Sequence, residues 1–137
     1  MIYSMFTLIL LTLCIAGYLL KLRIDAVRNG DVKISVFRLY NSPDLPAKMQ
    51  QVSRNYSNLF EMPILFYCAA TLALVLHFDT PVMIFLSWLF VASRAVHSWI
   101  HITSNNVIRR LQAFMAGNIC ILLMWIILLW QYTVKAA

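Results

Sequence analysis

Ionisable and polar side chains recur inside the apolar stretches of this chain, at spacings that place them on shared helix faces. Within residues 82–102 they form one stripe, Arg94, His97, Ser98 and His101. Separations of three and four residues bring side chains onto the same side of a helix. A charged group inside a membrane span is destabilising unless it has a partner or faces a polar cavity. The stripe therefore indicates either a binding site or an internal ion pair.

A second polar set lies closer to the N-terminus. Arg54, Asn58 and Glu61 also share one helix face. Two interpretations of this set remain open. Asn58 and Glu61 have the spacing of a capping box, in which both side chains bind free amides at the start of a helix. If the helix begins earlier, near Ser53, the face points into the protein interior and Glu61 can pair with Arg94.

A third set, Asn106, Arg109 and Arg110, follows a polar turn. Cations at the start of a helix are unfavourable beside the positive end of the helix dipole, unless an anion binds there. Membrane topology alone explains Arg109, whereas Arg110 is a candidate for contact with an anion. Together the three sets suit a zwitterionic or anionic ligand, and the apolar helices beside them would admit a lipophilic co-substrate or lipid from the bilayer.

Metal binding and thiol chemistry by the protein itself are not expected. His97 and His101 lie one helical turn apart, a spacing that two metal ligands can have, but only Glu61 offers a further ligand nearby. We therefore predict no metal site. The cysteines are Cys14, Cys68 and Cys120. They lie in apolar runs without a CxxC spacing, which predicts small buried hydrophobic residues.

The composition indicates that most of the chain lies in a membrane. Hydrophobic residues make up 62% of the 137 positions and charged residues only 12%, about half the charged share of a soluble domain. Four apolar stretches, about 2–22, 59–78, 82–102 and 107–134, are long enough to cross the ~30 Å hydrocarbon core as helices. A polar loop covers about 23–57. We predict an all-α integral membrane protein, a single domain 1–137 folded as a four-transmembrane-helix bundle.

Basic residues are concentrated on one side of this predicted topology. The first loop contains Arg23, Arg28, Lys33, Arg38, Lys48 and Arg54, and Arg109 and Arg110 follow the turn on the same side. The opposite side has only Lys135. Lysine and arginine are enriched in cytoplasmic loops, which predicts a cytoplasmic first loop and external termini in an inner (cytoplasmic) membrane. The net charge of +6 is thus explained by topology, and no binding of nucleic acid is expected.

Three sequence elements resemble the MAPEG family, membrane-associated proteins in eicosanoid and glutathione metabolism, in a bacterial-type form. They are Asn58-Leu59-Phe60-Glu61 followed closely by Pro63, Arg94-Ala95-Val96-His97, and Arg110 at the start of the last span. The chain length, the four spans and the basic first loop also match. The resemblance implies a homotrimer that binds glutathione, as substrate or cofactor, between neighbouring subunits near the cytoplasmic face.

The resemblance also implies roles for individual residues. The implied glutathione-binding residues are Arg54, Asn58, Glu61, Arg94, His97 and His101, and the implied catalytic residue is Arg110. Asn58 and Glu61 would hold the peptide backbone or amino group, and Arg110 would meet a carboxylate or the thiol. Lys21 or Arg23 would stand where a first-span arginine reaches the site of the neighbouring subunit.

The implied activity is that of a membrane-embedded glutathione-dependent transferase or peroxidase acting on a lipophilic electrophile. His101 and Phe114 stand where family enzymes commonly have tyrosines, and a phenylalanine cannot donate a hydrogen bond. A non-catalytic trimer that binds lipid or glutathione is therefore an alternative. A small transporter built around Glu61 is a third, and the position of Glu61 near the membrane edge argues against it.

Overall fold

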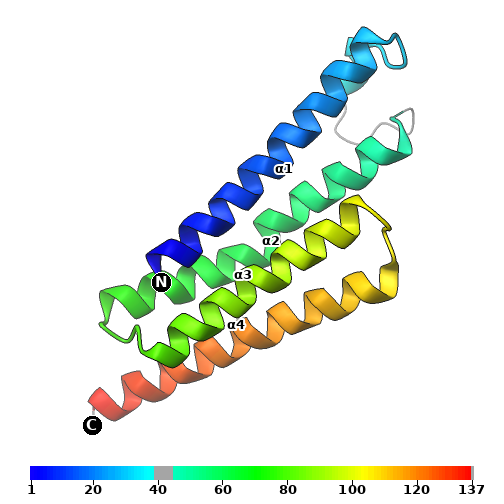
Figure 1. Ribbon diagram of the computed structural model, residues 1–137. Helices are drawn as coiled ribbons and strands as arrows, with labels where there is room; N and C mark the ends of the chain where they lie inside the picture. The colour runs from blue at the N-terminus through cyan, green and yellow to red at the C-terminus, as the bar shows by residue number, and fades with distance from the viewer. Residues whose placement is uncertain (39–44, 137) are drawn as a thin grey trace.

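The computed structural model describes residues 1–38 and 45–136 and shows four long helices. They are α1 (Ile2–Arg28), α2 (Ala47–Val75), α3 (Pro81–Ile102) and α4 (Val107–Ala136), with a short 3-10 helix, η1 (Ile34–Arg38), after α1. The helices alternate in direction, so both termini lie at the same end of the bundle (Figure 1). Each of the four is long and apolar enough to cross a membrane. The predicted all-α, four-transmembrane-helix bundle is confirmed.

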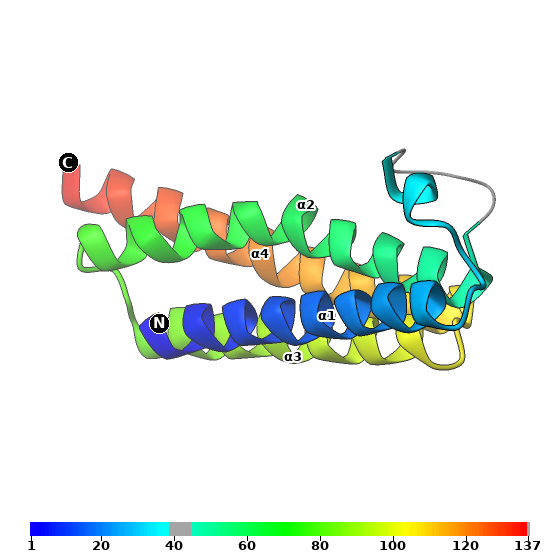
Figure 2. The same cartoon turned by 90° about the horizontal axis from the view of Figure 1, so that it is seen from above.

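The two ends of the bundle carry different connections. One end, called the basic end below, carries the end of α1, η1, the start of α2 and the turn 103–106 between α3 and α4 (Figures 1 and 2). The other end carries both termini and the connection 76–80 between α2 and α3. Basic residues of the predicted first loop, such as Arg28, Lys33 and Lys48, belong to the basic end and are exposed.

Helix α3 is the centre of the packing. It packs most extensively against α4 and also contacts α1 and α2. Phe66 of α2 and Phe90 of α3 are fully buried and stack with ring centroids 4.7 Å apart. Nearer the basic end, α1 and α2 bury a second apolar cluster that includes Ile15, Val52 and Leu59. Because lipid tails are as apolar as these side chains, close van der Waals packing holds the helices together.

The turns around α3 are fixed by local hydrogen bonds. The Thr80 hydroxyl accepts a hydrogen bond from the Met83 amide at 3.4 Å, and Pro81 opens the helix. At the other end of α3, Asn105 has a positive φ of 49°. Its amide donates to a carbonyl in the last turn of α3 at 2.8 Å. Such a left-handed residue ends a helix and reverses the chain, and asparagine tolerates it better than most residues.

Two helices extend beyond the spans predicted from the sequence. Helix α1 continues to Arg28 and α2 begins at Ala47, because backbone hydrogen bonding within a helix does not stop where the hydrocarbon core ends. Residues 39–44 of the predicted loop lie outside the described residues. The capping-box interpretation of Asn58 and Glu61 is wrong, since free amides occur only in the first turn of a helix and both residues lie well inside α2.

The three cysteines do not share one environment. Cys120 of α4 is buried, as predicted, whereas Cys14 of α1 and Cys68 of α2 are exposed on outer helix faces. The prediction of burial was wrong for these two, because a membrane helix is apolar on its lipid-facing side as well as on its interior side.

Gly117 allows α3 and α4 to approach each other closely. A Cβ atom at this position would lie 2.7 Å from Ser93 Oγ and 3.5 Å from the Phe90 ring. We expect Gly117→Ala to lower the thermal stability in detergent, by about 1–3 kcal/mol for a tightly packed site. Adding Ser93→Ala should restore most of the loss because the clashing oxygen is removed. Gly17→Ala is the control, since nothing lies within 4 Å of its Cβ; an equal loss there would contradict the packing argument.

Candidate functional site

Residues from three helices meet in a polar cavity near the basic end. Asn58 of α2, His97 of α3 and Arg110 of α4 line it, and Val107, Leu111 and Phe114 complete the described lining. The cavity has a volume of about 230 Å³. One residue from each polar set of the sequence therefore reaches the same space, although the sets are far apart along the chain.

The Arg110 side chain is held in a fixed position by two partners. Its Nη1 atom donates to Asn105 Oδ1 at 2.8 Å and lies 3.2 Å from His101 Nε2. Since a guanidinium only donates hydrogen bonds, His101 Nε2 is the acceptor, and the proton of the neutral ring is on Nδ1. Asn105 can reach Arg110 because its left-handed backbone turns the chain back over the start of α4.

His97 presents an acceptor to the interior. Its Nδ1 atom lies 3.1 Å from the carbonyl oxygen of Arg110, and a carbonyl only accepts, so Nδ1 carries the proton. Nε2 of the neutral ring is then an acceptor. This atom is buried and has no hydrogen-bond partner among the described residues. A donor group of a ligand would therefore be bound well there.

Arg94 is the most constrained polar residue of the site. Its side chain is 0% exposed, and none of its three guanidinium nitrogens has a hydrogen-bond partner in the described part of the chain. The Phe114 ring lies 5.5 Å from the guanidinium carbon. Glu61 attracts the charge electrostatically without a hydrogen bond to it. A buried cation without close partners destabilises the folded protein. Acceptor atoms from a ligand would therefore be bound favourably beside Arg94.

The remaining predicted site residues lie outside the described cavity lining. His101 is 2% exposed and contacts the site through Arg110. Arg54 and Glu61 are exposed on α2 and are not part of the described cavity lining. These two residues and Asn58 do lie on one side of α2, as predicted, but this side is partly exposed and is not turned fully into the interior. Arg109 is exposed as well.

Two side chains near the start of α2 support α3 in a way that was not predicted. Gln51 donates to the carbonyl oxygen of His101, and Lys48 donates to that of Ile102. These carbonyls lack partners within α3 because they belong to its last turn. The sequence placed both donors in a loop, and nothing in their spacing identified these partners.

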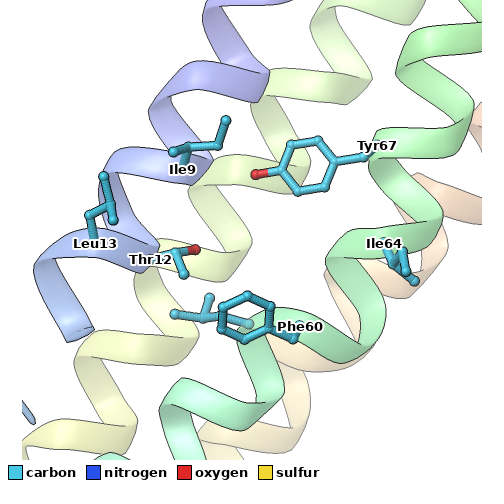
Figure 3. A pocket seen from close by; sticks show the side chains of 7 residues that line it. Ile9, Thr12, Leu13, Phe60, Ile64 and Tyr67 are labelled. Carbon is cyan, nitrogen blue, oxygen red and sulfur yellow. The ribbon is translucent and has the colours of Figure 1, made fainter.

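A second, apolar cavity lies between α1 and α2 (Figure 3). It has a volume of about 460 Å³ and is lined by Ile9, Thr12, Leu13, Leu59, Phe60, Ile64 and Tyr67. The Tyr67 ring extends from α2 toward α1, and its hydroxyl lies 3.5 Å from the Met5 carbonyl oxygen. One turn of α2 thus presents Asn58 to the polar cavity and the next two residues, Leu59 and Phe60, to the apolar one.

The fold and the site define an integral membrane bundle with a polar cavity at one end. A model of the MAPEG family matches residues 1–130. The chain belongs to the MAPEG family, which associates it with glutathione and eicosanoid metabolism at membranes, and the resemblance inferred from the sequence is confirmed. No curated protein and no solved structure matches the chain significantly.

The hydrogen bond from Arg110 to Asn105 can be tested without a ligand. Asn105→Gly keeps the left-handed backbone and removes only the acceptor, so we expect a loss of stability of about 1 kcal/mol. Asn105→Asp keeps the acceptor oxygen and should retain wild-type stability. Thermal unfolding is measured for both variants, alone and combined with Arg110→Ala. The double-mutant cycle then gives the interaction free energy between the side chains of Asn105 and Arg110. Additive effects of Asn105→Gly and Arg110→Ala would show that the contact contributes nothing.

Proposed function

We propose that this protein is a membrane-embedded, glutathione-dependent transferase or peroxidase that acts on a lipophilic electrophile. Family membership supports the use of glutathione. The observation that carries the proposal is the polar cavity, where Arg110 is held in place beside Asn58 and His97. Arg94 behind it lacks hydrogen-bond partners in the described chain.

The residues present fit glutathione, which has two carboxylates, an amino group, two amides and a thiol. Arg94 and Arg110 are suited to carboxylates or a thiolate, because guanidinium groups bind anions with several parallel hydrogen bonds. Asn58 can donate to and accept from an amide. The unpartnered His97 Nε2 can accept from the amino group or an amide. The family resemblance implies that each of these residues belongs to the glutathione site.

The proposed site is shared between subunits. The polar cavity of one chain, about 230 Å³, is smaller than the roughly 300–1,000 Å³ of typical ligand sites. Glu61 and Arg54 lie on the exposed side of α2, where we propose that a second copy of the chain brings them next to the ligand. A homotrimer, as the family resemblance implies, supplies such a copy at each of its interfaces. The basic end faces the cytoplasm in this proposal, in agreement with its lysines and arginines.

Arg110 has the main chemical role. A free thiol has a pKa of about 8.5 and is mostly protonated at neutral pH, whereas a nearby guanidinium stabilises the nucleophilic thiolate. The thiol proton goes to water. In a transferase reaction the thiolate forms a bond to the electrophilic carbon of the lipophilic substrate, and the leaving group departs with the electron pair of the bond that breaks. In a peroxidase reaction the thiolate attacks the outer oxygen of a hydroperoxide, the O–O bond breaks to release the alcohol, and a second glutathione converts the sulfenic acid to the disulfide and water. The protein supplies no covalent nucleophile, so its contribution is positioning and charge stabilisation.

Arg110→Ala should abolish most of the activity. Conjugation of glutathione to a model electrophile, measured in detergent, is expected to fall roughly 10²–10³-fold, the usual effect of losing one charge-stabilising group. Arg109→Ala is the matched control, since Arg109 is exposed beside the site and should leave turnover unchanged. Absence of turnover in the wild type, together with absence of glutathione binding by calorimetry, would end the proposal.

Phe114 supports a second candidate, a non-catalytic protein that binds glutathione or a lipid headgroup. The ring lines the polar cavity and lies 5.9 Å from His97, centroid to centroid. Its edge offers no hydroxyl to a thiolate. If glutathione raises the melting temperature of the wild type without any turnover, this second candidate is the correct one.

Phe114→Tyr distinguishes a weak catalyst from a binding protein. The added hydroxyl would lie at the polar cavity, which the Phe114 ring lines. We expect it to raise kcat roughly tenfold or more, because a hydrogen-bond donor beside the thiolate, or beside the negative charge of the transition state, has a large effect on the rate. The affinity for glutathione should change little. Steady-state kinetics and calorimetry on the same samples separate the two quantities. A fall in kcat with unchanged affinity would show that the ring position is unsuited to a donor.

A further inference from the structure

A row of buried and half-buried polar groups lies between α2 and α3, and some of its members have no role in the proposed chemistry. We call it the polar seam; it consists of Gln51, Asn55 and Asn58 of α2 and Arg94, His97, Ser98 and His101 of α3. On each helix these residues are separated by three or four positions, so each set forms one stripe. Asn55 and Ser98 belong to neither cavity and are not needed by the proposed chemistry.

Two contacts fix how the stripes face each other. Gln51 donates to the carbonyl oxygen of His101 at the basic end. Further into the bundle, about two turns along α2 and about one turn along α3, Asn58 and His97 line the same cavity. The helices run in opposite directions (Figure 1), so Asn55, between Gln51 and Asn58, faces the segment of α3 that contains Ser98.

The groups in the middle of the seam have no partners in the described part of the chain. Asn55 is 0% exposed, and both its amide nitrogen and its amide oxygen are unpartnered. Ser98 is 2% exposed, and its hydroxyl is unpartnered. His101 Nδ1, which carries the ring proton, is a third such atom. Buried polar atoms are hydrogen-bonded in almost all native structures, so a bound species must satisfy these.

The chemistry of the seam selects the bound species. The unpartnered atoms include donors, on Asn55 and His101, and acceptors, on Asn55 and Ser98. Arg94, in the same stripe, and Arg110, which contacts His101, disfavour a cation, and the acceptor oxygens disfavour an anion. Water both donates and accepts, and it needs two to four polar partners, which the seam supplies.

We infer that the polar seam binds ordered water molecules between Asn55, Ser98 and His101. These waters extend from the basic end along the stripe of α3 toward Arg94, whose guanidinium nitrogens lack partners in the described chain. They keep the buried guanidinium solvated when no ligand occupies the cavity. The inference stands whether or not glutathione is the ligand, so its test is independent of the proposed function.

The direct test is a high-resolution structure of the unliganded protein in lipid nanodiscs. Ordered solvent within hydrogen-bonding distance of the Asn55 amide and the Ser98 hydroxyl is the expected result. Direct hydrogen bonds between the two side chains, with no solvent between them, would overturn the inference.

Stability measurements provide a second test. If Asn55 had no partner at all, an apolar residue of similar size would be neutral or stabilising there, because an unsatisfied amide would be removed. If Asn55 binds water that also contacts Ser98, Asn55→Leu removes one anchor of the shared water. We therefore expect Asn55→Leu to lower the melting temperature and to be non-additive with Ser98→Ala.

Gln131→Leu is the matched control. Gln131 of α4 also has a buried, unpartnered side-chain oxygen, but it lies near the C-terminus, at the opposite end of the bundle. Its replacement should be additive with Ser98→Ala. A raised melting temperature for Asn55→Leu, or additivity of Asn55→Leu with Ser98→Ala, would show that no shared water binds between these side chains and would overturn the inference.

Discussion

A guanidinium group buried inside a membrane protein must find polar partners, and the site of this protein is organised around that requirement at Arg94. Neither lipid nor apolar side chains can replace the hydration that such a charge loses. Within the described chain, the Phe114 ring lies 5.5 Å from the guanidinium carbon of Arg94, and the guanidinium nitrogens have no hydrogen-bond partner. The position of Arg94 is therefore stable only because polar groups, and whatever they bind, are gathered around it.

The fold supplies these polar groups from helix ends. Because α2 begins at Ala47, its first turns lie beside the last turn of α3 and bring Gln51 and Asn55 to the interior. Asn105 has a left-handed backbone conformation that reverses the chain between α3 and α4. As a result, Arg110 in the first turn of α4 contacts His101. Polar side chains can thus approach Arg94 from the basic end, while the rest of the bundle remains apolar and closely packed.

The sequence predicted the parts of this arrangement that depend on periodicity. Hydropathy gave the four helices, and the spacing of Arg94, His97 and His101 gave a buried stripe on α3. Hydropathy identifies only the part of a helix that lies inside the hydrocarbon core. It therefore predicted a second span from about residue 59, whereas α2 begins at Ala47. That error made a capping box plausible for Asn58.

Contacts between helices depend on register and rotation, which spacing within one helix does not determine. The hydrogen bond from Gln51 to the carbonyl of His101 and the bond from Arg110 to Asn105 are of this kind. The same limit explains Arg54 and Glu61. Spacing placed them on one face with Asn58, but it could not show that this face runs along the exposed border of α2.

The exposed position of Glu61 has a physical consequence for assembly. A carboxylate that faces lipid near the border of the hydrocarbon core is unfavourable in free energy. A cation on an adjoining protein surface would stabilise it. Two cations at the end of α1 were candidates for that role in a neighbouring subunit. Arg23 is half-buried, with its guanidinium carbon 5.7 Å from the Phe37 ring of its own chain. Lys21 is exposed, and in the proposed shared site it is therefore the cation that we propose to reach Glu61 of another copy.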